Sequence, residues 1–268
     1  MTTYPRLGGM ALANGLLVHG PGHWAAAVRA PDGSVTVRSG AKPRLVVGPL
    51  GAVPLVRGAL RLGEAIAVLP VVRMRTPHAR FAMERPATGV GMLLSMAASA
   101  LARRHLRSPL AQETVAAVGG LLPAMLSLRG SQAAMWHAVE HKSIAAYEEG
   151  GPRGLVHAAD HPKEHERCGS NLVLPLVATS TIANVLLRRL PVRPGTGARA
   201  AAAGLGAGAA VELMGFTLRH PEHPVSRVVA ATGHFIQARF VTREPSAGDM
   251  VVGLRAMHEL FAAEGSSH

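Results

Sequence analysis

The chain has 268 residues, enough to bury a sizeable core, and only 16% of them are charged, against roughly 25% in an ordinary soluble domain. Its formal net charge of +12 comes mainly from arginine, and clusters of arginine suit anionic phospholipid headgroups or nucleic-acid phosphates. The aromatic content of 3% and the lack of RNP-like or zinc-finger spacings argue against nucleic acid. Cys168 is the single cysteine, which excludes an intrachain disulfide.

The first 50 residues carry the β signals of the sequence. Two short extended runs in 23–39 flank Pro31-Asp32-Gly33, and Asp-Gly between such runs indicates a hairpin because glycine reaches positive φ without strain. We therefore predict a small N-terminal β-hairpin region over 1–50. Beyond it, apolar residues recur at helical spacing and predict a helix near 57–75.

Four apolar stretches follow as two pairs, each joined by a short arginine-bearing connection. They occupy 86–102, 109–128, 171–187 and 200–216. Each lies at or just below the roughly 20 apolar residues that span a bilayer core, and Glu113 and Glu212 lower their hydropathy. Two interpretations stay open: hairpins embedded in a membrane, and hairpins buried in a soluble bundle. The orientation in a membrane is also open, because arginines flank both ends of the stretches.

These patterns predict a mainly α protein, a membrane-associated helical bundle with a small N-terminal β-hairpin region. Its three parts are 1–50, a helical and membrane-embedded region over 51–218, and a C-terminal helical region over 219–268. Two helices are expected in the last part, one through Arg239 and one from Asp249 to Ala263, with Asp249 as the N-cap or first-turn acid.

A candidate metal site lies in the stretch "HAVEHKSIAAYEEG". His137, Glu140 and His141 fall within a sector of about 100° on a helix, so their side chains converge. His-x-x-Glu-His is the spacing of inverzincin metallopeptidases, in which the histidines ligate zinc and the glutamate acts as general base. Glu148 shares the face but lies about 10 Å beyond His141, too far for the same ion.

Further ligands are available in "HPKEHERCGSN", where His165 and Cys168 stand three residues apart. If both bind, the site is closed and structural; if one binds, a position stays open for water and Glu140 is the candidate catalytic base. His157 and His161 are alternatives to His165. The predicted cofactor is therefore zinc or another divalent metal, held by His137, His141, His165 and Cys168.

Two functions stay open on this evidence. One is a metal-dependent hydrolase of an amide or ester, and the other is a non-enzymatic membrane scaffold or assembly factor with a structural metal site. A binder of anionic ligands through the arginine clusters is a third possibility. Membrane lipids are the expected partners, a homo-oligomer is open, and the substrate is unknown.

Four blocks of the chain resemble, in order, those of an uncharacterised bacterial membrane-protein family typified by YqhQ, a domain of unknown function. They are "GGMALANGLLVHGPGHWAAAVRAPDG", "WHAVEHKSIAAYE", "HERCGSNLVL" and "QARFVTREPSAGDMVVGLRAM". The resemblance implies an integral protein of the bacterial cytoplasmic membrane with a few helices, and no known reaction. Asn14 stands where the family usually has glutamate. The motif positions that it implies are His137, Glu140, His141, Lys142, Tyr147, Glu148, His165, Arg167, Cys168 and Gly169.

Overall fold

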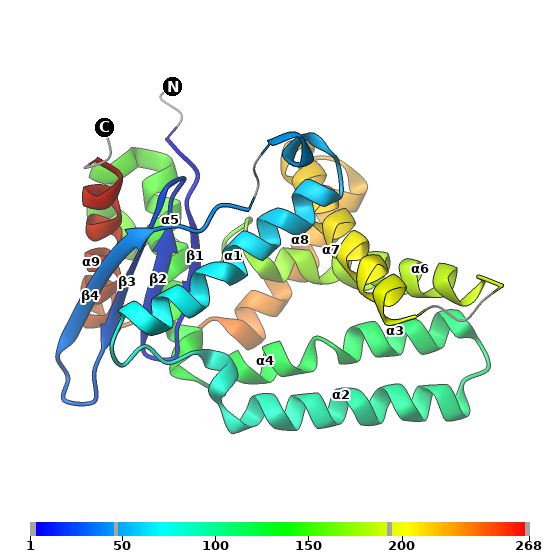
Figure 1. The fold of residues 1–268 in the computed structure, drawn as a ribbon. Helices are drawn as coiled ribbons and strands as arrows, with labels where there is room; N and C mark the ends of the chain where they lie inside the picture. The colour runs from blue at the N-terminus through cyan, green and yellow to red at the C-terminus, as the bar shows by residue number, and fades with distance from the viewer. Residues whose placement is uncertain (1–3, 46–47, 192–194, 266–268) are drawn as a thin grey trace.

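The computed structural model describes residues 4–45, 48–191 and 195–265. The ends of the predicted first and last regions, 1–3 and 266–268, lie outside the described residues, as do 46–47 and 192–194. The described chain is mainly helical, with a small antiparallel sheet at its N-terminus (Figure 1). This confirms the predicted fold class.

The sheet is a meander whose strands pair in chain order, each antiparallel to the next. Its strands in the described residues are β1 (Gly8–Ala11), β2 (Gly15–His19), β3 (His23–Arg29) and β4 (Val35–Ala41). The predicted hairpin is β3–β4, and Gly33 takes a φ of 85° in its turn. β1 and β2 were not predicted, so the β region is larger than one hairpin.

Helices cover both faces of this sheet (Figure 1). Helix α1 (Val56–Arg75), close to the predicted 57–75, packs Val68 and Val72 against the side that carries Trp24. On the other face, α5 (Gln132–Gly154) packs against β1 and β2, and α9 (Ala247–Gly265) packs against β2, β3 and β4. The central strands are therefore apolar on both sides, as strands between two helical layers must be.

The remaining long helices form two hairpins that extend away from the sheet (Figure 1). The first consists of α2 (Pro86–His105), then α3 (Pro109–Gly119) and α4 (Leu122–Leu128). The second consists of α6 (Val173–Arg188) and α7 (Thr196–Arg219). Helix α8 (Pro224–Ile236) follows and runs into a π-helical turn over Gln237–Val241, which leads to α9. Asp249 lies in the first turn of α9, as predicted.

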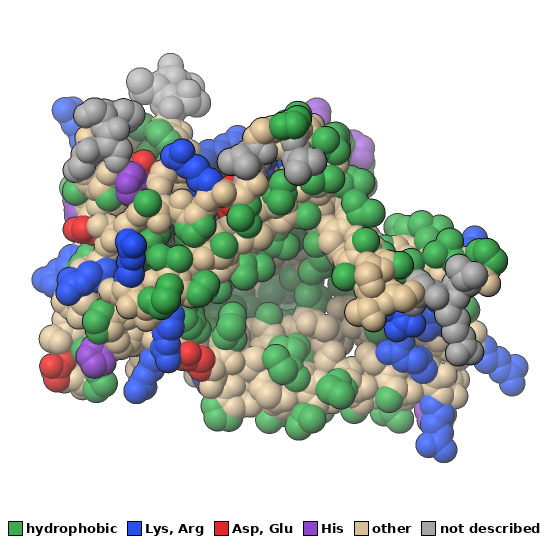
Figure 2. Space-filling model, viewed as in Figure 1, with side chains coloured by type: hydrophobic (Ala, Val, Ile, Leu, Met, Phe, Trp, Pro, Cys, Tyr) green, Lys and Arg blue, Asp and Glu red, His purple; other side chains and the backbone are tan. Residues whose placement is uncertain are grey.

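Three segments of the described chain are long and apolar enough to cross a membrane: Pro109–Leu128, Gly169–Arg188 and Thr196–Arg219. Only 17–22% of their apolar windows is buried inside the fold, so most of their surface needs an apolar environment outside it. The remaining apolar stretch of the sequence, 86–102, forms α2 and is not among these segments. Figure 2 shows apolar side chains spread over the hairpins and basic side chains at their far ends.

The acidic residues within these segments are paired with arginines. Glu113 of α3 is buried and meets Arg188 of α6 at 2.6 Å, and Glu212 of α7 accepts two hydrogen bonds from Arg57 of α1, at 2.6 and 2.7 Å. A paired carboxylate costs less in an apolar environment than an isolated one. The ion pairs therefore reduce the free-energy cost of placing Glu113 and Glu212 in an apolar environment.

Candidate metal centre

The centre is built on α5 and on the loop that precedes α6. The Ser131 hydroxyl caps α5 by accepting from the backbone N–H of Ala134 at 3.3 Å. Further along the helix, the ring centroids of His137 and His141 lie 4.3 Å apart, with the ring planes tilted by 57°. Cys168 reaches the same place, with its Sγ 3.3 Å from His137 Nε2. One ligand atom from each of these three residues lies within 4.8 Å of the others.

Backbone carbonyls orient both imidazoles. His137 Nδ1 donates to Val241 O at 3.0 Å, and His141 Nδ1 donates to Lys163 O at 2.5 Å. A carbonyl can only accept, so the proton of each neutral ring is on Nδ1 and the lone pair is on Nε2. Histidines that bind metals are held in this way, with one ring nitrogen on a carbonyl and the other free for the ion.

His141 Nε2 is buried and has no hydrogen-bond partner among the described residues. Burial lowers the pKa of His141, although the neighbouring Cys168 partly opposes that shift. The ring is therefore held neutral, which is the form that ligates a metal. A buried nitrogen with a free lone pair is costly unless a partner fills its place, so this observation fits a metal ligand.

Cys168 completes a set of three. Its side chain is 6% exposed, and its Sγ accepts from the backbone N–H of Ser170 at 3.4 Å. With Zn–N near 2.0 Å and Zn–S near 2.3 Å, tetrahedral ligands lie roughly 3.3–3.7 Å apart. The separation between Cys168 Sγ and His137 Nε2 is already of this size.

His165 lies beside the three-residue set but outside it. Its Nε2 meets Glu148 Oε2 at 3.3 Å, and its Nδ1 accepts from the backbone N–H of Arg167 at 3.3 Å. Its backbone is fixed by Gln237, which accepts from His165 N at 2.7 Å and donates to His165 O at 3.2 Å. The ring centroid is 5.8 Å from that of His141. A ligand role for His165 stays a prediction.

Glu148 and Gln237 support the site without joining the three-residue set. Glu148 forms an ion pair with Arg167 and contacts Nε2 of His165, so one carboxylate fixes the loop before Cys168 to α5. Arg167 also donates to the carbonyl of Leu7, at 3.2 Å. Gln237 is 1% exposed and was missed from the sequence, where an uncharged glutamine near a helix end gives only a weak signal.

Glu140 lies between α5 and β1. It is buried, and a Cβ added to Gly9 would meet its Cγ at 2.6 Å, so the glycine makes room for the acid. Burial raises the pKa of Glu140, and the nearby His137 and His165 partly oppose the shift. No hydrogen bond to its carboxylate is found among the described residues. Its assignment as a catalytic base stays a prediction.

The other polar residues of this region have structural partners. Buried Lys142 donates to the carbonyls of Ala159 and His161, at 3.1 and 2.7 Å, and pairs with Glu244 at 2.6 Å. The alternatives to His165 point elsewhere: His161 pairs with Glu149, and exposed His157 pairs with Asp160. Neither belongs to the three-residue set.

Comparisons with known proteins agree with the resemblance of the sequence blocks. A family model described as "Protein of unknown function (DUF1385)" matches residues 131–263, which contain the whole candidate centre. The chain is 22% identical over 309 aligned positions to the uncharacterized protein YqhQ of Bacillus subtilis (strain 168), covering 98% of this chain and 94% of that protein. No solved structure matches the chain. The two matches support the assignment of this chain to a YqhQ-like family of unknown function.

Proposed function

We propose that the chain is a membrane protein that binds zinc through His137, His141 and Cys168, and that it hydrolyses an amide or ester bond with Glu140 as general base. The observation that carries the proposal is the convergence of three ligand atoms within 4.8 Å, with both Nδ1 atoms held by carbonyls. Histidines on a protein surface rarely combine burial, a fixed tautomer and Nε2 lone pairs directed toward other ligand atoms.

The donor set favours zinc over harder cations. A thiolate and two imidazoles are the ligands that borderline and soft metals prefer, whereas magnesium and calcium take oxygen ligands. When bound at such a site, zinc supplies Lewis acidity and lowers the pKa of a coordinated water. The chain itself supplies the fixed rings, the buried thiol and the neighbouring carboxylate.

The position of His165 favours an open site. Three protein ligands and one free position are typical of catalytic zinc, while four protein ligands are typical of structural zinc. Glu148 and the N–H of Arg167 engage both ring nitrogens of His165, which holds this ring away from the fourth position. Glu140, next to His137, would then accept the proton of a water bound there.

A structural site is the second candidate, because His165 belongs to the same loop as Cys168 and lies beside His141. If His165 exchanged Glu148 for the metal, the ion would tie the loop before α6 to α5. The protein would then be a scaffold or assembly factor, and Glu140 would have no chemical role.

Metal content tests the binding step. Purified wild type, His137→Ala, His141→Ala and Cys168→Ser are compared by mass spectrometry for zinc per chain, with His157→Ala as the control because that histidine is exposed and lies outside the set. We expect one zinc in wild type and control, and loss of zinc in the three ligand variants. Equal, substoichiometric zinc in all five proteins would contradict the proposal.

Two further variants separate the candidates. An open catalytic site predicts that His165→Ala keeps its zinc and that Glu140→Gln keeps zinc but loses hydrolysis of amides and esters by about 10²–10⁴-fold. A closed structural site predicts that His165→Ala loses zinc and that Glu140→Gln changes little. Unchanged turnover in Glu140→Gln would overturn the catalytic role.

A further inference from the structure

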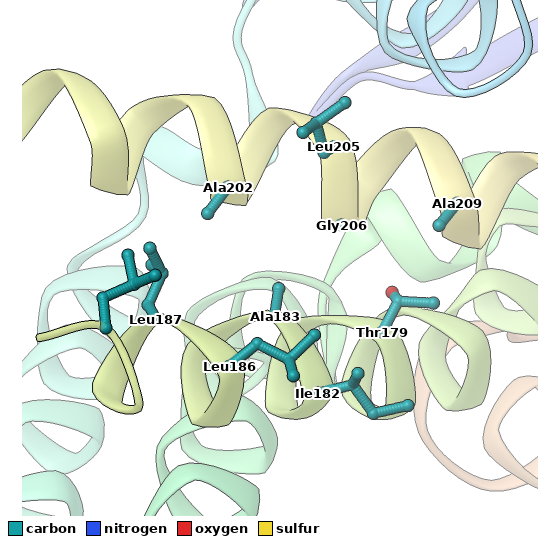
Figure 3. A pocket seen from close by; sticks show the side chains of 10 residues that line it. Thr179, Ile182, Ala183, Leu186, Leu187, Ala202, Leu205, Gly206 and Ala209 are labelled. Carbon is teal, nitrogen blue, oxygen red and sulfur yellow. The ribbon is translucent and has the colours of Figure 1, made fainter. Parts of the chain in front are cut away.

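An apolar groove lies between α6 and α7, away from the metal centre. It has a volume of about 410 Å³ and is lined mainly by Ile182, Leu186, Leu187, Leu190, Ala202 and Leu205 (Figure 3). The one hydroxyl in its lining belongs to Thr179 and donates to Pro175 O at 2.9 Å. The groove therefore offers no free polar group to a polar ligand.

The groove runs along both helices of the hairpin. From Thr179 to Leu187 it follows about 12 Å of α6, and from Ala202 to Ala209 about 10 Å of α7. Its elongated lining of aliphatic side chains fits an extended chain of methylene groups.

Basic side chains continue the groove at the end of the hairpin. Arg189, the C-cap residue of α6, follows Leu186 by three residues, and Arg199 precedes Ala202 by three on α7, so each extends a lining face by about one turn. Both are exposed, and neither has an ion pair or side-chain hydrogen bond within the described part of the chain. Arg188 differs, because it is paired with Glu113.

We propose that this groove binds one acyl chain of an anionic glycerophospholipid, whose phosphate is held by Arg189 and Arg199. The segments that carry the groove are two of those long and apolar enough to cross a membrane, so acyl chains are the apolar molecules present there. Two free guanidiniums at one end supply the charge complementary to a phosphodiester. The proposal is independent of the metal centre.

The arginines are tested with phosphatidylglycerol as the probe. The full-length protein is delipidated in detergent, and binding of phosphatidylglycerol and of phosphatidylcholine is measured by native mass spectrometry. We expect one tightly held phosphatidylglycerol per chain, and a rise in Kd of about 30-fold in Arg189→Gln/Arg199→Gln. The control Arg103→Gln/Arg104→Gln removes the same charge at the tip of the other hairpin and should change Kd less than threefold.

The groove is tested by filling it. Ala202→Phe places an aromatic ring in the lining and should abolish retention of the lipid, whereas Ala201→Phe adds the same ring at an exposed position that does not line the groove. If Ala202→Phe fails to fold, the arginine variants still test whether the groove binds the phospholipid.

Three results would overturn the proposal. One is wild-type lipid binding in Ala202→Phe, and another is equal weakening by the two arginine pairs, which would indicate unspecific charge. The third is a wild-type dimer that Ala202→Phe converts to a monomer, because a second copy would then cover the groove.

Discussion

At the scale of single residues, His19 links stability to pH. It lies at the end of β2, opposite Trp24, and burial together with the charge of Lys42 lowers its pKa to about 4. An unfolded chain has a histidine pKa near 6.5. Between these values the unfolded state binds more protons, so the free energy of unfolding falls as pH falls from about 6.5 to about 4. The full loss is at most about 3 kcal/mol.

This prediction is checked by comparing wild type with His19→Gln, both without metal and in the presence of a chelator, by denaturant unfolding from pH 7.5 to 4. Carboxylates and other histidines contribute equally to both proteins, so the difference isolates His19. Wild type should lose stability relative to His19→Gln as the solution is acidified, and the exposed His258→Gln should follow wild type. A pH-independent difference between wild type and His19→Gln would contradict it.

The residue scale also shows which parts of the candidate centre are predictable. Helical spacing is enough to place His137 and His141 on one face and to exclude Glu148 from their ion, because both follow from the rise and turn of one helix. The hydrogen-bond partner of His165 is harder to predict from the sequence. Gln237 is 72 residues away in the chain, and the carbonyls that orient the ligands carry no residue identity, so sequence patterns do not report them.

At the scale of elements, the crossing of α1 and α7 depends on glycine. A Cβ added to Gly208 would meet the carbonyl of Leu55, and one added to Gly58 would meet the carbonyl oxygen of Gly208 at 2.7 Å. Gly204, four residues before Gly208 on α7, has nothing within 4 Å of such a Cβ. The two glycines of this Gly-x-x-x-Gly step therefore have different roles.

Alanine substitution distinguishes them. Gly208→Ala must push α1 away and should cost about 1–3 kcal/mol, whereas Gly204→Ala should be neutral or stabilise by up to about 1 kcal/mol through its higher helix propensity. Thermal unfolding in detergent gives both values, and each variant is the control of the other. Equal melting temperatures would show that the close approach of α1 and α7 does not limit stability.

Elements whose apolar residues recur with a clear period could be predicted from the sequence, and elements without such a period could not. The helix expected near 57–75 is Val56–Arg75, because its apolar spacing continues to its end. Strand β2 (Gly15–His19) was missed since it is buried on both faces, and such a strand has no alternation to read. The stretch 109–128 divides into α3 and α4 at Gly119–Leu122, a break that hydropathy does not register.

At the scale of the whole molecule, the sheet and the hairpin tips lie at opposite ends of the long helices (Figure 1). The connections at the tips, 103–108 and 188–195, contain six arginines and no acidic residue. On the sheet side, the connection 129–168 carries five Lys or Arg residues and the 20 residues before α2 carry four more. Basic residues in connections of up to about 60 residues, and within about 20 residues of a span, favour the cytoplasmic side. The larger number on the sheet side therefore predicts a cytoplasmic sheet and hairpin tips on the outer side of the membrane.

Single cysteines report this arrangement, because the native Cys168 is buried and should react slowly with a membrane-impermeant maleimide. His105→Cys marks a hairpin tip and Ser34→Cys marks the β3–β4 turn, and both positions are exposed. We expect His105→Cys to be labelled in intact spheroplasts and Ser34→Cys only in inside-out vesicles, with both labelled after detergent lysis. Labelling from the same side would contradict membrane crossing, and the reverse pattern would contradict the charge argument. The expected result would also place the metal centre on the cytoplasmic side, because α5 packs on the sheet.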